Sequence, residues 1–278
     1  MATITPFTML SPRQTFEDNM RPAELLLRVY RLLDANDVIL TEGETVDALR
    51  QVVQATRSEE LMLIYNEIFL GLVRERAQLP RSTLRQVTLC HLLRQAVVAS
   101  CTALETYLPA LLRANLPVMI RARGRDFVPH GDETFADYFG DLQFDVDEVL
   151  RLLGDENAPE YISSKILGLT NFKYLSSRKG VHVVGVLMGL TDPSPWDAVA
   201  AHLNRDKREL MRILDETVSR RNDIVHRADR PQTDPGGEMQ EIAFAWTQQA
   251  VDTTKHVCLA LDELVTARVA ELEAMISA

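Results

Sequence analysis

The chain has 278 residues, 46% of them hydrophobic and 25% charged, and its formal net charge is −10 at pH 7. These proportions are those of a soluble globular protein with a substantial core, and the acidic balance excludes a protein that coats nucleic acid with its whole surface. The longest strongly apolar run, Val181–Leu190, is far shorter than the roughly 20 residues needed to cross a bilayer, so no membrane contact is expected.

The N-terminus and the cysteines predict a cytoplasmic protein. Residues 1–16 lack the basic start and apolar stretch of a secretion signal. Cys90 and Cys101 are expected on one helix, where their eleven-residue spacing separates them by about 16 Å, too far for a disulfide. Because no Cys-x-x-Cys pair is present, we expect reduced thiols, no metal site and no cofactor.

Helical spacing of apolar residues dominates the chain, and no convincing set of alternating strands is present, so the sequence predicts an all-α fold. Ser11–Asp34 is expected to form a helix, with Pro22 near its start or breaking it in two. The residues predicted to face inward are Leu25, Leu26, Val29, Leu32 and Leu33.

Two further helices are expected at Glu44–Thr56 and Ser58–Gln78, and Pro80 then interrupts the pattern. We therefore expect residues 1–80 to form an N-terminal helical extension. Residues 81–278 are expected to form the main helical domain, with a less regular central insertion at about residues 116–195.

The strongest helix is expected at Ser82–Ala114, with Pro109 placed where it could kink the last part. Apolar residues occupy most of its circumference, which indicates a central core helix. Arg94 and Glu105 lie along nearly one line of it but three turns apart. Each therefore needs a partner from another helix or another subunit.

The central insertion predicts short helices at Asp145–Leu153, Ile162–Leu167 and Lys179–Leu190. Between the last two, a loop at Thr170–Ser177 carries an aromatic and cationic group. Such a group could stack on bases beside a cation, but packing against the core is favoured. Its members are Phe172, Lys173 and Tyr174.

The C-terminal part predicts helices at Trp196–Leu203, Asp206–Arg227 and Ile242–Ala274, with a polar loop at Ala228–Gly237. The second of these helices is amphipathic, and its predicted inward residues are Leu210, Ile213, Leu214, Thr217, Val218, Ile224 and Val225. Between residues 205 and 230, eight Lys or Arg stand against six Asp or Glu. This local excess suits capture of a short RNA stretch, although charge alone favours a helix with internal ion pairs.

The end of this helix carries groups that could cleave RNA without a metal. Such cleavage needs a base, an acid and positive charge beside the phosphate. His226 titrates near neutral pH, Arg221 offers forked donors, and Asn222 shares a helix face with His226. Arg221 and His226 are about 140° apart around an ideal helix, so a two-fold dimer would complete the site and supply two histidines.

The spacing alone is a weak signal. Arg125 and His130 repeat the same Arg-x-x-x-x-His interval, but Pro129 makes a regular helix through them improbable. His91 could join a site, yet a hydrogen-bonded histidine at the core boundary is favoured. No Gly-rich phosphate loop, H-E-x-x-H or G-x-S-x-G run is present, which disfavours nucleotide triphosphatase, zinc protease and esterase functions.

The run Arg221-Asn222-Asp223-Ile224-Val225-His226 closely resembles the R-N-x-x-x-H signature of the HEPN superfamily. The similarity extends to the RiboL-PSP-HEPN branch through Leu92–Val98, Ala103–Tyr107, Trp196–Ala200 and the His226-x-Ala228-Asp229 sequence. The resemblance implies a HEPN-like helical bundle, a homodimer and a metal-independent endoribonuclease. By 2′-hydroxyl attack it would leave a 2′,3′-cyclic phosphate and a 5′-hydroxyl. Such enzymes act as toxins or antiviral defence effectors, so an antitoxin or regulatory partner protein is possible.

The resemblance also implies roles for individual residues. Arg221 and His226 would be catalytic, with Asn222 in support. Glu105 would line the site. The residues expected to contact RNA phosphates are Arg220, Arg227 and Arg94. Since some HEPN domains bind without cutting, the alternative is a non-catalytic scaffold that binds RNA or a nucleotide or serves dimerisation.

Overall fold

The computed structural model describes residues 10–34, 86–127, 137–173, 175–234 and 236–277. All regular elements within these ranges are helical, which confirms the all-α fold class. The helices expected at 44–56 and 58–78, and the boundary expected near residue 80, lie outside the described residues. None of the described helices is both long enough and apolar enough to cross a membrane.

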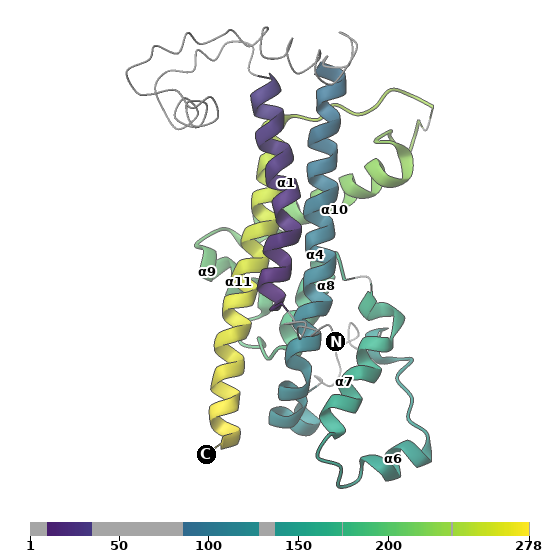
Figure 1. The fold of residues 1–278 in the computed structure, drawn as a ribbon, viewed down its shortest axis with the longest axis vertical. Helices are drawn as coiled ribbons and strands as arrows, with labels where there is room; N and C mark the ends of the chain where they lie inside the picture. The colour runs from purple at the N-terminus through teal and green to yellow at the C-terminus, as the bar shows by residue number, and fades with distance from the viewer. Residues whose placement is uncertain (1–9, 35–85, 128–136, 174, 235, 278) are drawn as a thin grey trace, which may run out of the picture.

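Three long helices form the body of the molecule: α1 (Pro12–Asp34), α4 (Gln86–Arg123) and α11 (Phe244–Ser277). They run side by side, as Figure 1 shows, and α4 contacts both of the others. The expected central helix is therefore confirmed, but it is longer than predicted. It continues through Pro109 and Pro117, because burial of the surrounding leucines outweighs the backbone hydrogen bonds that the prolines remove.

Helix α1 is continuous through Pro22, and its predicted inward face is wrong. Leu25 is 61% exposed, and Leu26 and Val29 are only partly buried; the side chains of Leu32 and Leu33 lie outside the described residues. The buried stripe lies on another side of the helix and is richer in large side chains: Phe16, Met20, Ala23, Leu27 and Tyr30. Their alternating spacing of four and three residues spans nearly the whole helix, so this face buries more area than the leucine cluster could. Helix α1 is thus part of the common core.

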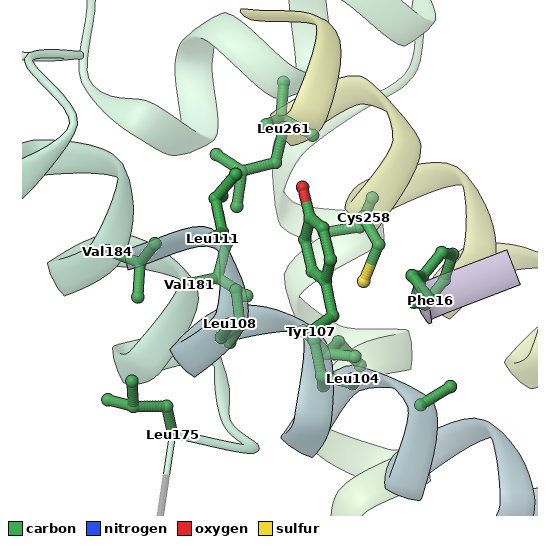
Figure 2. Close-up of a cluster of buried hydrophobic side chains, with 14 of the residues drawn as sticks. Phe16, Leu104, Tyr107, Leu108, Leu111, Leu175, Val181, Val184, Cys258 and Leu261 are labelled. Atoms are coloured by element: carbon green, nitrogen blue, oxygen red, sulfur yellow. The ribbon is translucent and has the colours of Figure 1, made fainter. Parts of the chain in front are cut away.

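Helix α8 (Arg178–Leu187) closes one side of the core. Figure 2 shows Val181 and Val184 of this helix pointing towards Leu108 and Leu111 of α4. All four side chains are buried. The later part of the expected irregular insertion therefore belongs to the core, because most residues of α8 are apolar and buried.

The remaining elements are shorter: η2 (Gly124–Asp126), α6 (Val146–Leu152), α7 (Ala158–Gly168), η3 (Thr170–Lys173), α9 (Pro195–Leu203) and α10 (Lys207–Arg227). Phe172 in η3 is 1% exposed and lies against the rings of Tyr138 and Phe139. For Phe172, packing is confirmed and base stacking is wrong. The side chains of Lys173 and Tyr174 lie outside the described residues.

Helix α10 is amphipathic over its first three turns, where Leu210, Ile213 and Leu214 are buried as predicted. Its last turns differ from the prediction, since Val225 is 50% exposed. Asn222 and His226, which share that face, are exposed too. Ile224, also predicted inward, is partly buried against the core, so the end of the helix keeps one side on the core and presents the other to solvent.

Candidate functional site

Two consecutive left-handed residues shape the end of α10. Ala228 and Asp229 have φ values of 50° and 62°, and the Asp229 N–H donates to the Asp223 carbonyl at 2.9 Å. This arrangement satisfies a free carbonyl of the last turn and reverses the chain. As a result, the Asp229 side chain is fully buried, although it follows an exposed helix end.

Asp229 holds two arginines that the sequence assigned to phosphate. Arg94 Nε lies 2.6 Å from Asp229 Oδ2, and Arg220 Nε lies 2.6 Å from Oδ1. Arg94 also donates to the carbonyl of Gln240 at 2.8 Å, and Arg220 to that of Glu241 at 2.8 Å. The Arg94 side chain is buried, with 5% of it exposed, and its bonds to Asp229 and Gln240 tie α4 to the chain after α10. Phosphate contact by either arginine would require these bonds to break.

The anchoring role of Asp229 was missed by sequence reasoning. Its signal was the His226-x-Ala228-Asp229 run, but nothing in that run shows that the carboxylate turns inward. The direction depends on the left-handed backbone at Ala228 and Asp229 and on Arg94, which is 135 residues away.

Arg221 lies beside Glu105, the residue that the resemblance expected to line the site. Arg221 Nη2 lies 3.4 Å from Glu105 Oε2 on α4 and donates to Ser176 Oγ at 3.1 Å. The Arg221 side chain is 17% exposed and that of Glu105 is 32% exposed. The guanidinium is thus held at the junction of α4, α10 and the segment before α8. Sequence reasoning missed Ser176, which no motif marks.

Cys101 lies close to Arg221 in the buried side of this junction. Burial raises the pKa of the Cys101 thiol to about 11, although the nearby Arg221 charge acts in the opposite direction. The thiol is in contact with the Thr217 carbonyl, 3.9 Å from Sγ. A thiol with this pKa is not a nucleophile at neutral pH, so Cys101 serves packing.

His226 and Asn222 lie on the exposed face of α10, away from this junction. Among the described residues, no hydrogen bond joins His226 to Arg221. Arg227, expected at phosphate, forms an ion pair with Asp223 one turn earlier. One chain therefore positions Arg221 beside Glu105 and leaves His226 open, without bringing the two predicted catalytic groups together.

The other candidate histidines and the repeated spacing lie elsewhere. His91 is exposed on α4, so its predicted place at the core boundary is wrong. Arg125 lies in η2, while His130 is outside the described residues. Within the described ranges, no group of three His, Cys, Asp or Glu side chains could hold a metal ion.

A cavity of about 820 Å³ is lined by Cys90, Arg94, Arg230 and residues 236–243. Neither Arg221 nor His226 lines it. No family model, curated protein or solved structure matches this chain. The candidate site is the exposed end of α10, and it is defined by the side chains of Arg221, Asn222 and His226.

Proposed function

We propose that this chain is a metal-independent endoribonuclease of the HEPN kind, with its site at the end of α10. One observation carries the proposal. Arg221 is fixed by Glu105 and Ser176, while His226 and Asn222 stand open to solvent on the same short stretch of helix. A fixed cation and an accessible imidazole are two of the groups that RNA cleavage without a metal requires, and a second proton-transfer group must complete them.

In the proposed reaction, the imidazole of His226 takes the proton of a ribose 2′-hydroxyl. The 2′-oxygen then forms a bond to phosphorus as the bond from phosphorus to the 5′-oxygen breaks. The leaving oxygen receives a proton, and the products are a 2′,3′-cyclic phosphate and a 5′-hydroxyl. Arg221 stabilises the charge on the phosphate oxygens, and Asn222 orients the imidazole or the phosphate.

A second copy of the chain completes this site in our proposal. Arg221 and His226 are about 140° apart around the helix, and the Arg221 guanidinium is held towards α4. The partner's copy of this helix would bring a second histidine, so one imidazole serves as base and the other as acid.

Cleavage of a labelled RNA in EDTA tests the function. Wild type should cut, and His226→Ala and Arg221→Ala should lower the rate by roughly 100- to 10,000-fold, the range for losing a general acid or base. His256→Ala is the matched control, because His256 is also exposed and lies on α11. Cleavage that stops in EDTA, or that survives His226→Ala, contradicts the mechanism.

One observation favours the alternative, a scaffold that binds RNA or a nucleotide without cutting. Four of the guanidinium groups near this end face carboxylates: Arg94 and Arg220 face Asp229, Arg221 faces Glu105, and Arg227 faces Asp223. RNA binding by wild type without cleavage would support the scaffold. If cleavage is found, we propose a toxin or defence role, restrained in the cell by an antitoxin or regulatory protein.

A further inference from the structure

Helix α6 carries its apolar residues on the side that faces solvent. Val146 is 73% exposed, Val149 46%, Leu150 60% and Leu153 72%. At about 100° per residue, Val146, Val149 and Leu150 lie within one stripe roughly 100° wide. Leu153 is the extended residue directly after the helix. None of the residues of α6 is buried. A helix of a monomeric domain normally turns such a stripe inward.

Polar contacts hold the opposite side of α6 against the protein. Glu148 lies about 200° around the helix from Val146. It accepts a hydrogen bond from the Tyr161 hydroxyl, and Lys165 Nζ donates to Glu148 Oε2 at 2.6 Å. Asp145 and Glu148 also form a reciprocal capping box, with bonds of 2.7 and 2.9 Å. These bonds orient the helix so that the apolar stripe stays outward.

The rim of the stripe is acidic. Exposed acidic residues flank the stripe along the chain: Asp141, Asp145, Asp147, Asp155 and Glu156. Arg151, the one cation of α6, lies about 140° around the helix from Val146, on the side of Glu148. Two copies meeting through this stripe would bring two acidic rims together, which is unfavourable. RNA and anionic membranes are disfavoured for the same reason. A partner that buries the four apolar side chains should therefore present positive charge around its own apolar face.

We propose that the α6 stripe is a docking surface for another protein, which contributes an amphipathic helix flanked by Lys or Arg. The recognition would be that of a helix whose apolar residues at positions i, i+3, i+4 and i+7 cover a complementary apolar strip. Charge at the rim sets the choice of partner and the rate of association. This surface does not depend on the RNA-cleaving function proposed for α10.

The probe for this surface is a synthetic peptide helix of about five turns, with leucines at that spacing and lysines flanking them. Its twin has glutamate in place of every lysine. Binding to the full chain is followed by fluorescence anisotropy. The basic peptide should bind wild type, and Leu150→Gln with Leu153→Gln should weaken binding at least about tenfold.

Leu25→Gln is the matched control, because Leu25 is also an exposed leucine but lies on α1; its binding should equal that of wild type. Circular dichroism establishes that each variant is folded. Equal binding of the glutamate twin, or unchanged binding by the double variant, overturns the proposal. If wild type is a dimer and the double variant is a monomer, the occupant of the stripe is a second copy of the chain. If wild type adsorbs to phosphatidylserine vesicles and the double variant does not, the occupant is a membrane. Either result overturns the proposal.

Discussion

At the scale of single residues, Asp229 is the anchor of the candidate site. Its carboxylate is fully buried between Arg94 and Arg220 and ties the end of α10 to α4. The Asp229 carboxylate is the acidic partner of both guanidinium groups. Without it, both would lose their ion pair. The position of the exposed His226, three residues earlier, follows from this anchor.

We expect Asp229→Asn to destabilise the fold by about 3 kcal/mol, the low end of the cost of breaking a buried ion pair. Asparagine tolerates the left-handed backbone at this position, so the change isolates the charge. Urea denaturation measures the loss. Glu238→Ala, an exposed acidic residue in the same loop region, should change stability by less than about 0.5 kcal/mol. Equal midpoints for the two variants would contradict the anchoring role.

Some residues of the site could be predicted from the sequence, and others could not. The partners required by Arg94 and Glu105 followed from their charge on an apolar helix, and the structure supplies them as Asp229 and Arg221. The identity of a buried partner 135 residues away depends on tertiary packing, which no local pattern encodes. Ser176 is hidden for the same reason.

At the scale of elements, the start of α8 sets the position of Ser176. The Gly180 N–H donates to Ser177 Oγ at 3.1 Å, and a Cβ on Gly180 would overlap the Leu175 carbonyl oxygen. The backbone of the preceding segment therefore lies directly against the first turn of α8. This close approach fixes the hydroxyl that holds Arg221.

Gly180→Ala should lower the free energy of unfolding by about 2 kcal/mol, because backbone must move to admit the methyl group. It should also reduce any RNA cleavage, since Ser176 moves with Leu175. Gly168→Ala in α7 is the control; its new methyl group meets no atom within 4 Å, and stability should be unchanged or rise by less than about 1 kcal/mol. Thermal unfolding and the RNA assay measure both effects, and a fully stable Gly180→Ala would contradict the contact.

The attachment of α6 predicts a pH dependence. Hydrogen bonds from Lys165 and Tyr161 lower the pKa of Glu148 to about 2. The ordinary value in an unfolded chain is about 4.3, so the contribution is complete above that pH and is lost as the pH falls towards 2. Hydrogen exchange should show α6 attached at pH 4 in wild type and loosened in Glu148→Gln. Loosening of wild type already at pH 4 would contradict the lowered pKa.

Periodicity predicted the long helices better than their faces. The apolar spacing located α4, α10 and α11 because each carries a continuous stripe. For α1 it located the helix but not the buried face. The helix has two apolar stripes, and the buried one is the stripe that contains Phe16 and Tyr30. The helix expected at Lys179–Leu190 is present as α8, and its Gly180 and Gly185 lie directly against neighbouring segments.

At the scale of the whole molecule, the proposed catalytic site needs two copies of the chain. Wild-type chain co-expressed with about a ninefold excess of His226→Ala should retain about 1% of full activity if a site needs both histidines, because random pairing makes wild-type pairs that rare. Independent chains would retain about 10%. His256→Ala in the same excess should leave activity unchanged. A fall in simple proportion to the wild-type fraction would contradict a shared site.

The fold class of the whole chain was predictable, and its function remains a proposal from a short motif. Helical spacing extends over hundreds of residues, so many weak signals add up to an all-α fold. A catalytic site depends on a few side chains and, in our proposal, on a second copy of the chain. Its geometry is therefore not contained in the pattern of one helix.

The chemical ends of the RNA fragments show whether the RNA is cut by 2′-hydroxyl attack. Wild-type protein incubated with RNA in EDTA should leave 2′,3′-cyclic phosphate and 5′-hydroxyl ends, identified by mass spectrometry. The same ends should be absent with His226→Ala. Fragments with 3′-hydroxyl and 5′-phosphate ends, or RNA that stays intact with wild type, would contradict cleavage by 2′-hydroxyl attack at the end of α10.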